Sequence, residues 1–328
     1  MIYNTFGESF YIKGANVQAT TYFLMAVWPW FMPLLFLLAG VSSAYALQKR
    51  TAKEYVKERI SKLLIPLIFG VLLLVPIQTY FAEVFHNGYT GNYFEQYILF
   101  FTKPTDFSGY SGGFTPAHLW FVLYLFVISL VALPIMNFYQ KSDKKLPIHK
   151  FSMPVLLLLF IIPVFSQLIL DFSGKSIGEY LTYFLFGYFL ISSDIIQVKL
   201  QKYRRILLGL AVLSGLLLIN TFVRGGNEFL YEFLYAFYAW VAVLTILGFG
   251  KQYLEFANRT TYYLSKASFG IYIIHQQWIV ITAYFALMWI QNIPLQMICI
   301  ILASTVFTFM TYEVFRRFYV TQYMFGLK

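Results

Sequence analysis

Long apolar runs separated by short basic segments constrain this chain more than any other feature. From Met32 the run MPLLFLLAGVSSAYAL leads into the basic segment TAKEYVKERISK, and a second apolar run, LLIPLIFGVLLLVPIQ, continues through Pro66. A helix needs about 20 apolar residues to cross the hydrocarbon core of a bilayer. The stretch therefore predicts two membrane helices that are joined by a short, positively charged hairpin.

The same rule divides the rest of the chain into apolar segments of similar length. Nine segments result: 24–47, 63–84, 118–138, 152–170, 177–197, 204–222, 229–249, 267–289 and 293–314. They are continuously apolar, whereas the strands of a membrane barrel alternate. Only 12% of the residues are charged, against about a quarter in soluble domains. We therefore expect an all-α, polytopic membrane bundle that forms a single domain over residues 1–328.

The positions of Lys and Arg between the segments predict the orientation of the helices. Twenty of the 24 basic residues fall in alternate loops and in the C-terminal tail, and the other side holds only Lys13, Lys103, Lys175 and Arg224. Basic loops are typical of the cytoplasmic side. We expect a multi-pass protein of the inner or plasma membrane with a cytoplasmic C-terminus. Its net charge of +10 is explained by this topology and by anionic lipids, and it does not indicate a nucleic-acid partner.

Nine helices with a cytoplasmic C-terminus would place residues 1–23 outside the cell. This stretch has no basic region followed by an apolar region, so it does not resemble a signal peptide. One interpretation is that the N-terminus is translocated without a signal. The alternative is that a further membrane helix belongs before Met1.

A polar stripe crosses the segment KASFGIYIIHQQW. Its members, which share one face of a helix at spacings of three and four residues, are Ser265, Ser268, Tyr272 and His275. His275 lies nine residues beyond Lys266, about 13 Å into the membrane and near its midplane. Ionisable groups at that depth are costly and mark functional sites. His275 is therefore a candidate base, although a structural histidine bonded across helices fits the pattern as well.

His118 opens the segment PAHLWFVLYLF at the predicted outer boundary. Next to Trp120, it is typical of an aromatic-belt anchor. Alternatively, it lines an outward-facing acceptor cleft with acidic residues near the same boundary. These are Glu83, Glu179, Glu228 and Glu232. Solvated helix ends are the commoner explanation of such acidic residues.

Arg59 and Lys62 lie three residues apart where the second membrane helix begins, so they share a helix face. They fit the excess of basic residues on the cytoplasmic side, and they also fit a site for the phosphates of an anionic donor. Cys299, the single cysteine, lies in an apolar run and is expected to be a core residue, with no metal site. The chain has no GxxxxGK[ST], GxSxG, HExxH or CxxC pattern, so it lacks the usual sequence support for the corresponding enzymes.

Five motifs, taken in order, resemble a known family. MPLLFLLAG, KERISKLLIPLIFG, VPIQTYF, HLWFVLYLF and SFGIYIIHQ are similar to those of the acyltransferase 3 family of integral membrane O-acyltransferases. Within that family they resemble the branch similar to glucan biosynthesis protein C. The resemblance covers approximately residues 30–290. It is specific because all five motifs occur in order with membrane helices between them.

The resemblance implies transfer of an acyl group, of the acetyl or succinyl type, from cytoplasmic acyl-CoA to a hydroxyl of a glycan or another cell-envelope acceptor. It implies donor binding by Arg59 and Lys62 and places His118 and His275 in the catalytic motifs, with Phe269 where the second motif usually has Tyr. The supporting side chains are expected to be Ser268, Tyr272, Trp120, Glu83 and Glu232. Acyl-CoA is the donor substrate, and no bound cofactor is expected.

Members of this family normally begin with a membrane helix that carries an Arg near its start and a catalytic His near its end. The resemblance thus implies ten helices in an intact member and agrees with the topological argument for a helix before Met1. In that case His275 would support or orient the reaction.

Two other functions fit the sequence. A transporter or flippase for an amphipathic or lipid-linked molecule would also bind its substrate near the midplane, although the sequence shows no clear internal repeat. An inactive fragment or a membrane scaffold is the third possibility. Release of CoA from acyl-CoA separates the enzyme from the other two.

Overall fold

The computed structural model describes residues 2–6, 10–105, 113–143, 145–171 and 174–327. These residues form helices and no β-strand. The elements are α1 (Gln18–Leu47), α2 (Ala52–Arg59), η1 (Ile60–Leu64), α3 (Ile65–Leu73), α4 (Val75–Asn87), α5 (Tyr93–Thr102), η2 (Ala117–Leu119), α6 (Trp120–Lys141), η3 (Ile148–Lys150), α7 (Met153–Leu158), α8 (Ile161–Ser166), α9 (Ile177–Phe186), η4 (Gly187–Ile191), α10 (Asp194–Val223), α11 (Glu228–Tyr253), α12 (Arg259–Trp289), α13 (Ile293–Phe315) and α14 (Tyr319–Met324).

Within the described part of the chain, seven helices are long and apolar enough to cross a membrane. They span Gln18–Leu47, Ala52–Asn87, Ala117–Lys141, Asp194–Val223, Glu228–Tyr253, Arg259–Trp289 and Ile293–Phe315. The remaining two predicted segments, 152–170 and 177–197, contain the shorter apolar helices Met153–Ser166 and Ile177–Ile191. The all-α, polytopic membrane fold is therefore confirmed.

One of the shorter segments is broken where a continuous helix was expected. The segment 152–170 consists of α7 and α8, which are separated at Leu159 and Phe160. Pro163 has no N–H to donate to the carbonyl of Leu159 and its ring crowds that carbonyl. Instead, the Ile162 N–H bonds the Leu159 carbonyl at 3.1 Å, which gives a tighter turn at the break.

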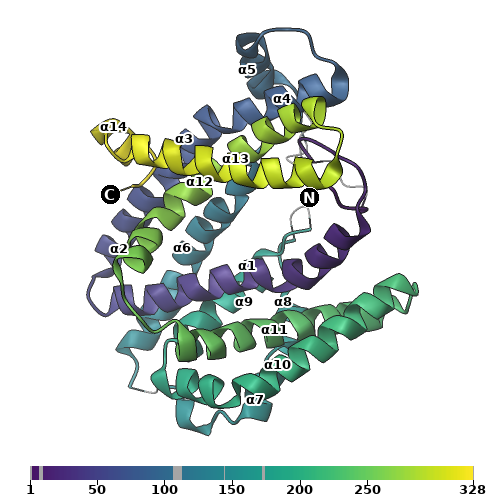
Figure 1. The fold of residues 1–328 in the computed structure, drawn as a ribbon. Coiled ribbons are helices and arrows are strands. Elements are labelled where there is room, and N and C mark those ends of the chain that lie inside the picture. The colour runs from purple at the N-terminus through teal and green to yellow at the C-terminus, as the bar shows by residue number, and fades with distance from the viewer. Residues whose placement is uncertain (1, 7–9, 106–112, 144, 172–173, 328) are drawn as a thin grey trace. The chain divides into compact units, whose positions relative to one another are not determined.

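The helices group into two compact units, and the expectation of a single domain stays a prediction. The first unit comprises Met1–Thr21, Lys57–Phe126 and Ala257–Lys328. In it α12 packs beside both α13 and α4 (Figure 1). Phe81 of α4 meets Tyr284 of α12 edge-on, with ring centroids 5.1 Å apart. This contact helps to hold α4 beside α12.

Residues near the N-terminus complete the core of the first unit. Buried side chains from this stretch pack on α4, α12 and α13; they are Ile2, Tyr3, Tyr11 and Ile12. The Tyr3 hydroxyl donates to Oε1 of Gln296 in α13 at 3.1 Å. A buried tyrosine hydroxyl needs such a partner, so this bond fixes the N-terminal stretch on α13.

The second unit comprises Tyr22–Val56 and Val127–Phe256. The long helices α10 and α11 form its main pair (Figure 1). In the same unit, α1 crosses closely over the junction of α9 and η4. A Cβ at Gly40 would lie 1.9 Å from the Phe184 carbonyl oxygen of α9, and one at Gly187 of η4 would lie 1.9 Å from the Leu37 carbonyl oxygen of α1. Small residues permit such close packing in membrane bundles, so both glycines are required for this crossing.

Candidate active site

Two histidines from distant parts of the sequence meet in the first unit. His118 lies in η2, directly before α6, and His275 lies in the middle of α12. Their ring centroids are 5.2 Å apart and the ring planes are nearly perpendicular, at 87°. From the sequence, one was expected at the outer boundary and the other near the midplane. The structure brings them into a single site.

Hydrogen bonds in both directions fasten the turn that carries His118 to α12. The His118 Nε2–H donates to the carbonyl of Ile273 at 3.0 Å. The Tyr272 hydroxyl donates in turn to the His118 carbonyl. Ala117 has a φ of 50°, in the left-handed region that is costly for an alanine. The two bonds therefore hold a strained turn in place.

The bonds to backbone carbonyls also decide which ring nitrogens carry hydrogen. A carbonyl only accepts, so His118 is protonated at Nε2, and its Nδ1 lone pair is buried with no hydrogen-bond partner among the described residues. His275 donates from Nδ1 to the Tyr272 carbonyl at 2.6 Å. Its Nε2 therefore carries a lone pair in the neutral ring, and this atom is not among the fully buried polar atoms.

A small residue lets η2 pack next to α3. A Cβ at Gly70 would lie only 2.6 Å from Cδ1 of Leu119 and 3.7 Å from Cγ2 of Ile273. Leu119, the residue after His118, is fully buried. Gly70 thus sets how closely the histidine turn and α12 approach α3.

Two of the predicted supporting residues make local contacts. Ser268 is exposed, and its hydroxyl donates to the Ser265 carbonyl of its own helix at 2.9 Å. Trp120 packs edge-on against Tyr124, with centroids 5.3 Å apart. The polar stripe predicted on α12 therefore contributes Tyr272 and His275 to the histidine site, while Ser268 is satisfied within the helix.

Arg59 and Lys62 lie at a local change of helix type. Arg59 ends α2, and Lys62 lies in the π-helical turn η1. Pro66 has no N–H to donate to the Lys62 carbonyl, four residues before it. Just ahead of this proline, the Ile65 N–H bonds the Ile60 carbonyl, five residues back, which gives the wider π-helical turn. Single π turns often occur at functional sites. Lys62 is exposed and forms an ion pair with Glu58 at 2.7 Å.

The C-terminal residues connect the basic turn with the histidine helix. Gly326 has a φ of +63°. A Cβ added to Gly326 would lie 2.9 Å from Cγ of Pro66 and 3.4 Å from Cε1 of Phe269. Phe325 is buried and stacks on Phe315, with centroids 5.0 Å apart. Pro66 and Phe269 therefore border the same tightly packed spot, so the start of α3 lies close to α12 ahead of His275.

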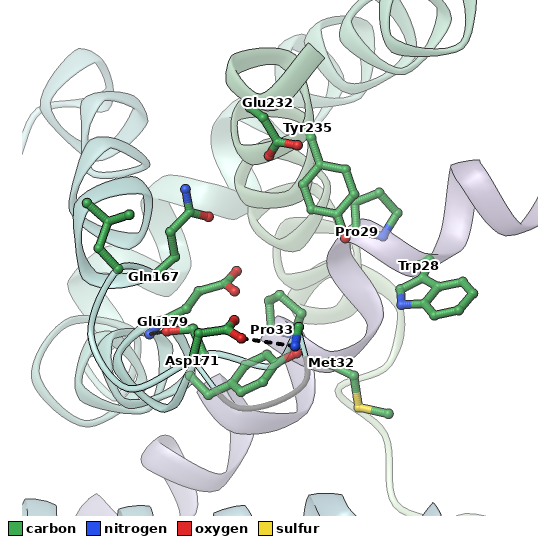
Figure 2. A pocket seen from close by; sticks show the side chains of 13 residues that line it. Trp28, Pro29, Met32, Pro33, Gln167, Asp171, Glu179, Glu232 and Tyr235 are labelled. Carbon is green, nitrogen blue, oxygen red and sulfur yellow. Dashed lines mark hydrogen bonds between the residues drawn. The ribbon is translucent and has the colours of Figure 1, made fainter. Parts of the chain in front are cut away.

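The acidic residues of the predicted acceptor cleft belong to both units, so that cleft stays a prediction. Glu83 is buried in α4, where it pairs with Lys103 at 3.2 Å and accepts from the Asn87 amide at 2.9 Å. It is therefore satisfied by structural partners. Glu179 and Glu232 line a cavity of the second unit (Figure 2), whereas Glu228 is not among the lining residues.

Sequence reasoning missed two buried amides of the first unit. Both side-chain polar atoms of Gln78 in α4 are buried without a hydrogen-bond partner among the described residues, as is Oε1 of Gln277 in α12. Unpaired buried amides are costly. The signal was a glutamine within each of the apolar motifs VPIQTYF and SFGIYIIHQQ.

Comparison with known proteins identifies the family. The family model Acyl_transf_3, described as an acyltransferase domain, matches residues 2–313. No curated protein and no solved structure matches the chain. The similarity to the glucan biosynthesis branch stays a prediction. Because the family model covers nearly the whole chain, this protein belongs to the acyltransferase 3 family and is a membrane acyltransferase.

Proposed function

We propose that this protein transfers an acyl group, of the acetyl or succinyl type, from cytoplasmic acyl-CoA to a hydroxyl of a glycan or another cell-envelope acceptor. The observation that carries the proposal is the contact between His118 and His275, with ring centroids 5.2 Å apart. It brings together the motifs HLWFVLYLF and SFGIYIIHQ of an acyltransferase family. The imidazole of His275 has an available lone pair on Nε2. The basic turn at Arg59 and Lys62 belongs to the same unit.

In the proposed reaction, Nε2 of His275 accepts the proton of the acceptor hydroxyl. The oxygen attacks the thioester carbonyl carbon of the donor, the new C–O bond forms and the C–S bond breaks. The proton then passes from the imidazolium to the departing CoA sulfur, so that the products are the ester and free CoA. A histidine suits this role because its unperturbed pKa lies near the working pH.

The other two residues of the site position this imidazole. The Tyr272 carbonyl accepts from His275 Nδ1 and keeps the lone pair on Nε2. The Tyr272 hydroxyl holds the His118 turn against α12. The His118 ring then packs edge-on to the ring of His275 and limits its rotation.

Arg59 and Lys62 are the proposed donor-side groups. Their segment reaches α12 near Phe269, through the contacts of Pro66 around Gly326. Phe269 precedes His275 by six residues, which is about 9 Å along a helix. A donor with its phosphates at the basic turn would therefore extend its acyl arm toward the histidines. The basic loops face the cytoplasm in this proposal, where acyl-CoA is available.

The proposal is tested with membranes that contain the protein and receive acetyl-CoA labelled in the acetyl group. We expect release of free CoA, together with label in an ester that hydroxylamine cleaves. Membranes without the protein give the background. Movement of an acceptor across the membrane with no CoA release above background would contradict the proposal and support a transporter.

A further inference from the structure

A cavity in the second unit has the features of a second binding site. It has a volume of about 520 Å³, within the size range of small-molecule sites. Its wall is built from the middle of α1, from the α8–α9 connection and from the first turns of α9 and α11. The α1 wall includes Pro29 and Pro33, which remove two backbone donors from that helix. None of these residues takes part in the histidine site.

The charge of the cavity wall has one sign. Asp171, Glu179 and Glu232 line it, and no Lys, Arg or His occurs among the lining residues that the structure describes. Figure 2 shows Asp171 and Glu179 on one side of the space and Glu232 on α11 across from them. Asp171 accepts from the Gly174 N–H at 3.0 Å, and Lys175 of the same connection is not a lining residue.

Several polar groups that face the cavity have no protein partner. Among the described residues, none hydrogen-bonds to the Glu179 carboxylate, the Gln167 amide or the Tyr235 hydroxyl, and all three residues are half-buried. Polar side chains at such positions are normally hydrogen-bonded. Figure 2 shows all three directed into the same space. They are therefore available to a ligand.

The spacing of the acidic groups distinguishes between kinds of cation. No three His, Cys, Asp or Glu side chains in the described part of the chain are grouped closely enough to hold a metal ion. The carboxylates instead occupy separate parts of the wall. They fit a larger cation whose charge is spread over a molecular surface.

Aromatic rings also line the cavity. They belong to Trp28, Tyr180 and Tyr235, and the ring of Phe36 stacks on that of Tyr180 with centroids 4.5 Å apart. Aromatic faces attract ammonium ions, and such rings form the usual sites for quaternary ammonium groups. We propose that this cavity binds an organic ammonium compound, with the carboxylates supplying charge and the aromatic rings supplying contact surface.

The test uses two probes of the same shape, choline and its uncharged isostere 3,3-dimethylbutan-1-ol. Binding to the purified full chain in detergent is followed by calorimetry and by tryptophan fluorescence. We expect choline to bind at least roughly tenfold more tightly than the isostere, because cation–π and charge interactions of 1–2 kcal/mol correspond to such a ratio. Equal binding of the two probes, or no binding of choline, would overturn the proposal.

Variants locate the site. Each of two substitutions, Glu179→Gln and Glu232→Gln, should weaken choline binding by about three- to tenfold. Glu232 lies exposed in the first turns of α11. The matched control is Glu255→Gln, which removes an acidic group of the same unit that pairs with Lys251 outside the cavity. Choline affinity that is the same in Glu232→Gln as in Glu255→Gln would contradict the assignment.

A neutral polyol is the alternative occupant. Glucose that competes with choline at similar concentrations would show a polyol site and contradict the ammonium assignment. The proposal is independent of acyl transfer, and the two are separated by His275→Ala, which should leave choline binding unchanged whatever its effect on CoA release.

Discussion

Tyr272 and His118 join their two segments through a pair of hydrogen bonds. The Tyr272 hydroxyl donates to the His118 carbonyl, and the His118 ring donates from Nε2 to the carbonyl of Ile273, the residue after Tyr272. Their ring centroids are 5.7 Å apart. The pair joins the end of a loop to the middle of a membrane helix. It therefore determines where the imidazole of His118 lies relative to that of His275.

Tyr272→Phe should impair the reaction without changing donor binding. The substitution keeps the ring and leaves the half-buried His118 carbonyl without its donor, a loss of about 1–3 kcal/mol. We expect kcat to fall by roughly tenfold and KM for acetyl-CoA to stay constant, since the donor-side residues are untouched. The Tyr124→Phe variant, at a ring that packs on Trp120, is the control. Equal kcat values for the two variants would contradict the positioning role.

Gly70→Val should displace the His118 turn. The Cβ of the added side chain would lie only 2.6 Å from Cδ1 of Leu119, so the two side chains would compete for the same space. Such overpacking lowers the free energy of unfolding by about 1–3 kcal/mol. We expect lower activity and lower thermal stability. The double variant Gly70→Val with Leu119→Ala should recover part of both, because the shortened side chain makes room. A double variant worse than the sum of the single effects would refute this packing account.

Gly40→Ala and Gly187→Ala should destabilise the second unit. At both positions a Cβ would lie 1.9 Å from a carbonyl oxygen of the neighbouring helix, which side-chain rotation cannot relieve. We expect at least about 3 kcal/mol of lost stability, measured by thermal unfolding in detergent. Gly209→Ala, where nothing lies within 4 Å, is the control and should be neutral or slightly stabilising. Equal melting temperatures for Gly40→Ala and Gly209→Ala would refute the close crossing.

Arg59→Ala and Lys62→Ala should weaken donor binding. The loss of one phosphate partner should raise KM for acetyl-CoA by about three- to tenfold and leave kcat nearly unchanged. The effect of Lys62→Ala should shrink at high salt, since Lys62 is exposed and exposed charges are screened. Lys53→Ala, an exposed residue of the same basic hairpin, is the control. An equal rise in KM for the control would mean that only the net charge of the hairpin matters.

The sequence was sufficient to predict the class of fold because the apolar runs are long and the charges lie between them. It was insufficient for local breaks, such as the one that Pro163 imposes on the segment 152–170. The proline was visible in the sequence, but its effect depends on whether neighbouring helices support a continuous path. The expectation of a further helix before Met1 stays a prediction.

The candidate site could be predicted only in part. Tyr272 and His275 were found because helical spacing places them on one face. Their contact with His118 was not predicted, because it joins residues 118 and 275, far apart in the sequence, through bonds to backbone carbonyls. The ion pair of Glu83 with Lys103 was missed for the same reason. Periodicity describes one helix at a time and does not determine which helices become neighbours.

The most direct test of the central claim is the rate of CoA release by His275→Ala in membranes, compared with His149→Ala at equal protein levels. His149 lies exposed in η3 and has no proposed role. General-base catalysis contributes about 100- to 10,000-fold, so we predict a fall of at least roughly 100-fold for His275→Ala and an unchanged rate for His149→Ala. A His275→Ala rate equal to that of wild type would remove His275 from the reaction and contradict the proposed mechanism.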